Sequence, residues 1–291
     1  MDERFTIRSV ITYMKDRLKR AGIRDYEEDA FLLLNCVREF SKSDILLNGD
    51  KTLDEQERVK LFYLLHDRLR RVPMQHITEK AYFYGMEFKV NGNVLIPRPD
   101  TEILVEEVLK NLMGDERVLD MCTGSGCILI ACDKADSASG FNIRSGTGVD
   151  ISVKALEVAK ENAKKHGADN LEFIQGDLFE NVRGEYDLIV SNPPYIPGRD
   201  IPDLDPEVRD FDPLCALDGG EDGLSFYRRI AEGAPDHLKK DGTIYLEIGY
   251  NQAEDVSKIL EEKGFSDTEI IKDYGGNNRV VKAVSRTGTG R

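Results

Sequence analysis

Apolar residues recur at helical spacing through the first quarter of the chain. One run has them three to five residues apart, at Phe5, Val10, Met14 and Leu18. Residues 31–34 centre a second segment, and a third run repeats the spacing at Val59, Phe62, Leu65 and Leu69. Such spacing is typical of amphipathic helices that bury one face. The pattern predicts a small helical bundle over residues 1–76, with no catalytic group in it.

The pattern changes to alternating apolar and polar positions between residues 77 and 99. The dipeptide Asn91-Gly92 separates the apolar runs 87–90 and 94–96, and Asn-Gly between two such runs favours a β-hairpin turn. Pro97 and Pro99 then end the segment. We interpret residues 77–99 as a β-hairpin linker between two domains.

Strand and helix patterns alternate from residue 100 to the end of the chain. Short apolar strands are expected at 118–120, 146–150, 171–175 and 185–190, with helices between them at 127–134 and 152–166. Such alternation predicts an α/β fold with a doubly wound, mainly parallel sheet over residues 100–291. A further strand is expected at 243–248, after a helix at 224–238. Two last strands facing each other across Gly275-Gly276 suggest an antiparallel pair that finishes the sheet.

Two segments of this second domain are predicted to be loops. Residues 136–146 are polar and glycine-rich, which suggests an exposed loop. Residues 199–223 are rich in Asp, Pro and Gly, and a loop of that length in a compact domain usually covers an active site.

Charge and composition narrow the possible functions. The chain has 291 residues and a net charge of −14. Residues 1–75 contain 15 Lys and Arg against 14 Asp and Glu, so the remainder, with 25 against 40, carries the acidity. An acidic body repels phosphate backbones, which argues against non-specific nucleic-acid binding.

No apolar run approaches the ~20 residues that span a bilayer, and the first residues lack a secretion signal. We therefore expect a cytoplasmic protein without a membrane partner, and a monomer. The five cysteines form no C-x-x-C pair or zinc-type cluster, so no metal is expected.

The stretch Asn192-Pro193-Pro194-Tyr195 follows an apolar strand and suggests a specific chemistry. Each proline fixes its own φ near −65°, and Pro194 also keeps Pro193 out of the helical region. The result is a stiff elbow that presents the Asn192 amide carbonyl, the Pro193 backbone carbonyl and the Tyr195 ring. Two acceptors beside a flat ring suit a planar NH2 group.

Polar features end four successive strands: residues 120–126, Asp150, Asp177 and Asn192. Ligands bind at this edge of a doubly wound sheet. Gly124 and Gly126 allow close backbone approach, Asp150 suits a ribose diol, and Asp177 could accept from an adenine amino group. The site thus predicts a nucleoside-containing cofactor.

The cofactor that fits best is S-adenosyl-L-methionine. A dinucleotide fingerprint needs a third glycine where Leu129 stands, and no Gly-Lys-Ser/Thr phosphate loop is present. The residues expected to bind it are Asp120, Cys122, Thr123, Gly124, Ser125, Gly126, Asp150, Ile151, Asp177, Leu178 and Asn192.

The turn Asp120-x-x-Thr-Gly-Ser-Gly126 followed by Asn-Pro-Pro-Tyr resembles that of class I (Rossmann-like) methyltransferases acting on a planar nitrogen. Nearly the whole chain resembles the PrmC/HemK family of release-factor glutamine N5-methyltransferases. The resemblance extends through Pro73-Met-Gln-His-Ile77, Phe83-Tyr-Gly85, Leu95-Ile-Pro-Arg-Pro99, Leu204-Asp-Pro-Glu-Val208, Ala216-Leu-Asp-Gly-Gly-Glu-Asp-Gly223 and Leu246-Glu-Ile-Gly249.

This resemblance implies methyl transfer to the glutamine amide of the GGQ motif in class 1 peptide-chain release factors. We expect residues 1–76 to recognise the substrate, because a single glutamine on a loop offers little area for recognition and this module lacks catalytic groups. The catalytic residues would be Asn192, Pro193 and Tyr195, and the substrate-binding residues would be Phe83, Arg98, Asn192, Pro193, Pro194 and Tyr195. For Phe83 and Arg98, core packing and a surface salt bridge are equally open.

Two other functions remain open from the residues alone. A DNA or RNA adenine N6 methyltransferase would flip its base into the same elbow, although the acidic body argues against it. A non-catalytic adaptor that binds the cofactor is the other. The chain also departs from the family pattern: Cys122 stands where the family usually has Gly, and the 136–146 loop is longer than usual.

Overall fold

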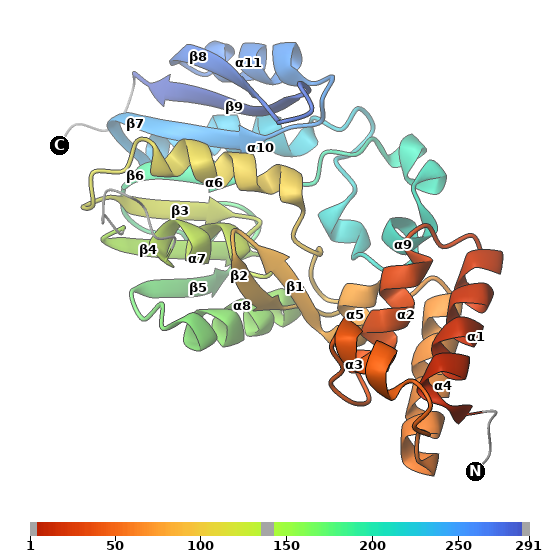
Figure 1. Cartoon of the computed structure of the whole chain (residues 1–291). Helices are drawn as coiled ribbons and strands as arrows, with labels where there is room; N and C mark the ends of the chain where they lie inside the picture. Colours follow the sequence, from red (N-terminus) through yellow and green to blue (C-terminus); the bar gives the residue numbers. More distant parts are fainter. Residues whose placement is uncertain (1–4, 135–142, 287–291) are drawn as a thin grey trace. The chain divides into compact units, whose positions relative to one another are not determined.

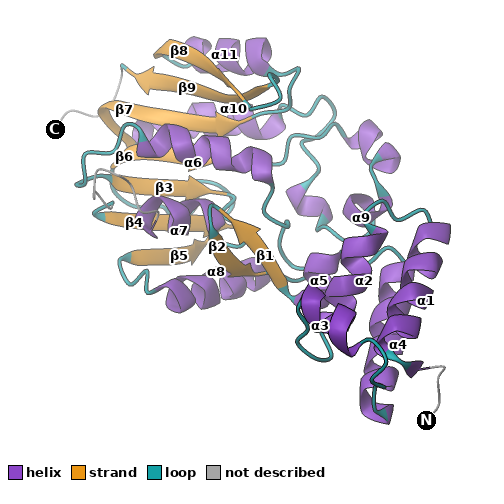
Figure 2. Cartoon of the chain, viewed as in Figure 1, coloured by secondary structure: helices purple, strands orange, loops and turns teal. Residues whose placement is uncertain are grey.

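The computed structural model describes residues 5–134 and 143–286, and these divide into two compact units between Glu79 and Lys80 (Figure 1). Most of the glycine-rich loop expected at 136–146 lies outside the described residues. Figure 2 shows the first unit as helical and the second as a sheet with helices. Within the described ranges, no helix combines the length and apolarity needed to cross a bilayer.

The first unit contains α1 (Ile7–Arg20), α2 (Tyr26–Asn35), α3 (Lys42–Asn48), α4 (Glu55–Leu69) and α5 (Met74–Thr78). Polar side chains begin three of these helices, because Thr6, Ser41 and Asp54 each accept a backbone N–H of the first turn. Apolar faces of α1, α2 and α4 meet in one core that includes Met14, Leu33 and Leu61. The predicted bundle is therefore present.

The second unit begins with a hairpin whose turn is not where the sequence suggested. Strand β1 (Lys80–Phe83) pairs with β2 (Met86–Lys89) across a two-residue turn at Tyr84-Gly85, both with positive φ. Asn91-Gly92 follows the hairpin instead of closing it. The apolar residues after it, Val94 and Ile96, pack with α8 residues and form no strand.

The seven-stranded sheet has the order β5-β4-β3-β6-β7-β9-β8, and only β9 runs antiparallel to its neighbours. Its strands are β3 (Arg117–Met121), β4 (Ser145–Asp150), β5 (Leu171–Gln175), β6 (Tyr186–Ser191), β7 (Leu238–Glu247), β8 (Phe265–Lys272) and β9 (Asn278–Ser285). The predicted parallel sheet with an antiparallel end is confirmed.

Helices cover both faces of this sheet. Helices α6 (Glu102–Leu109), α7 (Cys127–Lys134) and α8 (Val153–His166) pack on one face with Val118 and Val190. Helices α10 (Ser225–Gly233) and α11 (Ala253–Glu262) pack on the other with Leu119 and Ile189. Neighbouring residues of one strand thus enter opposite cores, as strand geometry requires.

The segment from residue 199 to 223 contains η3 (Gly198–Asp203), α9 (Pro206–Arg209) and η4 (Leu214–Ala216). The helix expected at 224–238 is shorter, because α10 ends at Gly233 and η5 (Ala234–Asp236), which contains Pro235, follows it. Strand β7 consequently begins at Leu238, five residues earlier than predicted.

Candidate active site

A cavity of about 570 Å³ opens at the carboxyl edge of the sheet in the second unit. It collects residues that are distant in sequence: Asn93 to Leu95, Cys122, Gly124, Val149 to Ser152, Ala155, Gly176 to Leu178, Asn192, Pro194, Pro213 to Ala216, Asp218, Phe226 and Arg229. Its volume is in the range of small-molecule sites. Of the predicted cofactor residues, Cys122, Gly124, Asp150, Ile151, Asp177, Leu178 and Asn192 line it.

The other predicted cofactor residues lie behind the cavity wall. Asp120 is fully buried at the end of β3, and its Oδ2 accepts the Thr123 hydroxyl at 2.6 Å. Burial raises the pKa of Asp120 to about 7. Ser125 is buried, and a Cβ at Gly126 would contact Ala159 on α8 at 3.2 Å. These residues shape the turn and the packing of α7.

Cys122 turns the chain out of the sheet with φ +59°, in the left-handed region that favours glycine. This turn lets the Thr123 N–H donate to the Val149 carbonyl at 2.9 Å, which ties the β3 loop to β4. The sequence had already marked this position, because the family that the chain resembles usually has glycine there.

Asp150 joins the two loops that flank the cavity. Its Oδ2 accepts the Gly124 N–H at 2.9 Å, and its Oδ1 accepts the Ser152 N–H at 2.8 Å. Burial raises the pKa of this carboxyl, and the two backbone donors oppose that rise. Each oxygen keeps a lone pair that could accept a ligand hydroxyl.

Asp177 has a partner that the sequence did not suggest. Its Oδ1 lies 2.7 Å from a guanidinium nitrogen of Arg229 on α10. The neighbouring Leu178 has φ +55° and lines the cavity. Asp177 is therefore an ion-paired carboxylate at the cavity wall.

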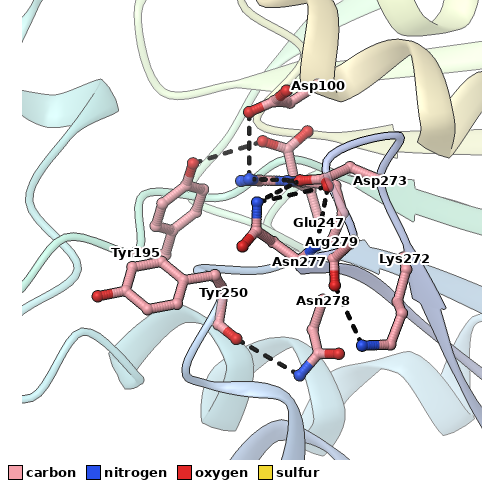
Figure 3. A network of polar contacts seen from close by, with 10 residues as sticks. Asp100, Tyr195, Glu247, Tyr250, Lys272, Asp273, Asn277, Asn278 and Arg279 are labelled. Carbon is pink, nitrogen blue, oxygen red and sulfur yellow. Dashed lines mark hydrogen bonds and ion pairs between the residues drawn. The ribbon is translucent and has the colours of Figure 1, made fainter.

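Of the elbow after β6, Asn192 and Pro194 line the cavity, whereas Pro193 and Tyr195 are not among its lining residues. Asn192 lines the cavity and its Nδ2 donates to the Thr101 hydroxyl at 3.2 Å. Among the described residues, none donates to the Pro193 carbonyl or to Asn192 Oδ1. The Tyr195 hydroxyl points to Glu247 at the end of β7, 3.5 Å from Oε1 (Figure 3).

Phe83 and Arg98 have partners that match the two alternatives left open for them. Phe83 is 1% exposed and packs edge-to-face on Phe88 in the core. The Arg98 guanidinium lies 2.6 Å from the buried carboxylate of Asp212 and thereby anchors the segment before η4. Neither Phe83 nor Arg98 is among the residues that line the cavity.

Comparison with known proteins identifies the family. The PrmC N-terminal domain model matches residues 9–78, and the methyltransferase small domain model matches residues 99–204. A release factor glutamine methyltransferase of Agrobacterium fabrum is 40% identical over 283 residues, covering 95% of this chain and 96% of that protein. The chain belongs to the release factor glutamine methyltransferase family.

Other relatives agree with this assignment. A release factor glutamine methyltransferase of Clostridium acetobutylicum is 41% identical over 92% of this chain and 94% of that protein. A crystal structure of a methyltransferase from Pyrococcus furiosus covers 80% of this chain and 99% of its own, with a TM-score of 0.53 and 19% identity. That second likeness shows the methyltransferase fold.

The residues present in this methyltransferase fit S-adenosylmethionine. Asp150 offers acceptors for ribose hydroxyls. A Cβ placed at Gly124 would lie 4.0 Å from the Cys122 carbonyl oxygen, so the space in front of this glycine is open. Three carboxylates and one guanidinium line the cavity, which suits a ligand with a cationic sulfonium and ammonium. The described side chains include no group of three or more His, Cys, Asp or Glu residues that could hold a metal ion.

Sequence reasoning missed several residues of the methyltransferase site. Thr101 and Glu247 contact the elbow from distant segments, and Phe226 and Arg229 line the cavity. Residues 213–216 and Asp218 also line it, and these belong to the loop 199–223 that was expected to cover an active site. Leu246-Glu-Ile-Gly249 and the segment before α6 were both part of the family resemblance. Neither contains a motif that would have indicated a catalytic or binding role.

Replacement of Asp150 by alanine should weaken binding of S-adenosylmethionine to this methyltransferase. Loss of an acceptor with charge typically costs roughly 1.5–3 kcal/mol. Calorimetry on the variant would measure it, with Asp200→Ala as a matched control, because Asp200 is exposed and does not line the cavity. Equal affinities for the two variants would remove Asp150 from the cofactor site.

Replacement of Cys122 by glycine should leave cofactor affinity equal or better. A non-glycine residue in the left-handed region costs about 1–2 kcal/mol, part of which the freer unfolded glycine chain cancels. The free energy of unfolding should therefore stay equal or rise slightly. Thermal unfolding and calorimetry measure both quantities, and a tenfold or larger loss of affinity would indicate that the thiol contacts the cofactor.

Proposed function

We propose that this protein transfers a methyl group from S-adenosyl-L-methionine to the glutamine side-chain nitrogen (N5) in the GGQ motif of class 1 release factors. The observation that carries the proposal is the elbow at the cavity wall, where the Asn192 amide donates away from the cavity to Thr101. Its oxygen is thereby left as an acceptor. Relatives at about 40% identity named release factor glutamine methyltransferases support the same substrate.

The proposed mechanism depends on two acceptors. A glutamine amide nitrogen is a poor nucleophile, because its lone pair is delocalised into its carbonyl. Asn192 Oδ1 and the Pro193 carbonyl would accept its two N–H bonds and fix the NH2 group for attack. Both dipoles then stabilise the positive charge that develops on nitrogen. S-adenosylmethionine supplies an electrophilic methyl group, and the cationic product loses its proton afterwards.

Tyr195 would pack against the amide plane, with its hydroxyl held toward Glu247. Pro193 and Pro194 are buried, which keeps the elbow rigid. Asp150 and the Gly124 backbone would hold the nucleoside part of the cofactor. The elbow alone would also suit an adenine amino group, and the relatives favour glutamine over that alternative.

We also infer that the protein works in the cytoplasm as a monomer and without a metal. These remain predictions from its composition and from its relation to enzymes of translation termination.

Replacement of Asn192 by alanine should lower kcat on release factor by roughly 10²–10³-fold, the usual cost of losing one preorganised group around a developing charge. Binding of S-adenosylmethionine should change far less. Asn111→Ala is a matched control, because that amide is exposed at the end of α6. Mass spectrometry of the release factor measures the transfer, and wild-type kcat in Asn192→Ala would contradict the elbow mechanism.

The first unit is proposed to recognise a folded part of the release factor. One glutamine on a loop offers little area, whereas stable interfaces bury on the order of 1,200–2,000 Å². Helix α4 exposes Val59, Phe62 and Tyr63, spaced for one face, with Phe62 at 66% and Tyr63 at 64% exposure. An exposed apolar stripe with two aromatic rings is the composition of an interface core.

This stripe borders a hollow of about 120 Å³ between α1 and α4, lined by Phe5, Val10, Tyr13, Met14, Leu53, Arg58, Leu61, Phe62 and Leu65. The Arg58 guanidinium lies over the Phe5 ring, 4.5 Å from its centroid, and covers one end. A pocket beside exposed aromatics is a typical place for a partner's anchor side chain.

Replacement of Phe62 by alanine should therefore reduce kcat/KM for intact release factor by at least roughly tenfold relative to kcat/KM for a short glutamine-loop peptide. This loss of kcat/KM should come mainly from a higher KM. Leu47→Ala is the matched control, because Leu47 is an 81% exposed apolar residue on α3 of the same unit. If Phe62→Ala and Leu47→Ala gave the same ratio, docking through α4 would be excluded.

A further inference from the structure

The elbow 192–195 contains two consecutive residues without a backbone donor. The sheet pairing of β6 ends at Ser191, which lies opposite Met121 on β3 and Leu246 on β7. The prolines at 193 and 194 have no N–H, so neither can donate a bond that would hold the chain beyond the sheet. Among the described residues, the first elbow carbonyl that accepts a hydrogen bond is that of Tyr195.

The side chain that holds this carbonyl is Gln252, which lies directly before α11 with 7% exposure. Its Nε2 donates to the Tyr195 carbonyl at 3.0 Å and to the Gly223 carbonyl at 3.3 Å. Its Oε1 accepts the Gly249 N–H at 2.9 Å. A backbone carbonyl only accepts and a backbone N–H only donates, so these three partners determine the orientation of the amide.

Two glycines let the chain before α10 approach the elbow closely. A Cβ at Gly223 would lie 2.4 Å from the Tyr195 carbonyl oxygen and 2.8 Å from Gln252 Nε2. A Cβ at Gly219 would lie 2.9 Å from the Pro194 carbonyl oxygen. Real Cβ atoms essentially never show such short contacts, so both positions require glycine. The Gln252 amide therefore lies in a tightly packed junction between the elbow and this segment.

We propose that Gln252 is a positioning residue that fixes the far end of the elbow and thereby keeps Asn192 and the Pro193 carbonyl in the geometry for methyl transfer. This inference rests on the proposed acceptor roles of these two residues. The sheet fixes the chain before the elbow, and Gln252 fixes it after the two prolines. Gln252 does not line the cavity, so it acts through the elbow and not through contact with substrate or cofactor.

The same amide joins the elbow to two other segments beside the cavity. Through Gly249 it holds the turn after β7, and through Gly223 it holds the end of the loop 199–223, of which residues 213–216 line the cavity. Misplacement of a catalytic group by roughly 1 Å can cost about 10²-fold in rate. We expect the effect of losing Gln252 in kcat, because the main docking surface for release factor is proposed to lie in the first unit.

The test compares Gln252→Met, which removes all three hydrogen bonds at nearly constant volume, with Asn170→Leu as a matched control. The Asn170 amide also joins distant segments, since its Nδ2 donates to the Asp133 carboxylate at 2.8 Å and to the Ile143 carbonyl at 3.2 Å. It precedes β5 and therefore lies at the amino edge of the sheet, away from the cavity.

Both variants should lower the free energy of unfolding, which thermal unfolding measures. Only Gln252→Met should lower kcat on intact release factor, on the order of 10–100-fold. Its KM for release factor and its affinity for S-adenosylmethionine should change far less. A wild-type kcat for Gln252→Met, or an equal loss of kcat in Asn170→Leu, would overturn the inference.

If Gln252→Met does not fold, Gln252→Glu decides. Measured at a pH at which its carboxyl group is ionised, it keeps an acceptor for the Gly249 N–H and has no donor for the carbonyls of Tyr195 and Gly223. It should show the same loss of kcat, and a wild-type kcat would exclude Gln252 as a positioning residue. A wild-type enzyme that transfers no methyl group to release factor would instead reject the proposed function.

Discussion

The parallel pairing of β3 with β4 and β6 is the constraint on which the site depends. Met121 pairs with Val149 on one side and with Ser191 on the other. The next residues, Cys122, Asp150 and Asn192, therefore lie side by side at the carboxyl edge of the sheet. A shift of one residue would displace a strand by about 3.3 Å and turn its side chains to the other face. The buried alternation of these strands prevents such a shift.

The turn after β3 has a left-handed backbone conformation, and two carboxylates at this edge of the sheet stabilise that turn. Cys122 adopts a left-handed conformation immediately after β3, and Gly124 does so two residues later. Asp120 accepts the Thr123 hydroxyl and Asp150 accepts the Gly124 N–H, so each carboxylate holds one part of the turn. Asp120 is buried and does not line the cavity, whereas Asp150 lines it and combines the same task with open acceptor positions.

Much of this arrangement could be predicted from the sequence. Strand periodicity and the rule that parallel strands end at one edge suffice to bring Cys122, Asp150 and Asn192 together. The hairpin turn could not be found, because Asn91-Gly92 has the stronger local signal and Tyr84-Gly85 is selected by the burial of Phe83 and Phe88. Tertiary packing outweighed turn propensity there.

Contacts between side chains of distant segments were the second feature that could not be predicted from the sequence. Thr101 and Glu247 are 146 positions apart and stand in no recognisable pattern, although Thr101 bonds to Asn192 and Glu247 to the Tyr195 hydroxyl. The pairing of Asp177 with Arg229 was hidden for the same reason. Periodicity shows where a strand ends, but only the packed structure shows which polar groups form hydrogen bonds or ion pairs with one another.

The elbow offers neutral acceptors to the reacting nitrogen, because Asn192 stands where a carboxylate could also have accepted its N–H bonds. An amide oxygen carries no net charge, so removing it from water costs less than removing a carboxylate would. Neutral carbonyl dipoles bind a neutral amide modestly and a developing cation more strongly. The carboxyl group of Glu247 contacts the elbow through the Tyr195 hydroxyl, which lies 3.5 Å from its Oε1. On the proposed mechanism, the methyl acceptor thus meets two neutral carbonyls, whose attraction strengthens as positive charge develops on the nitrogen.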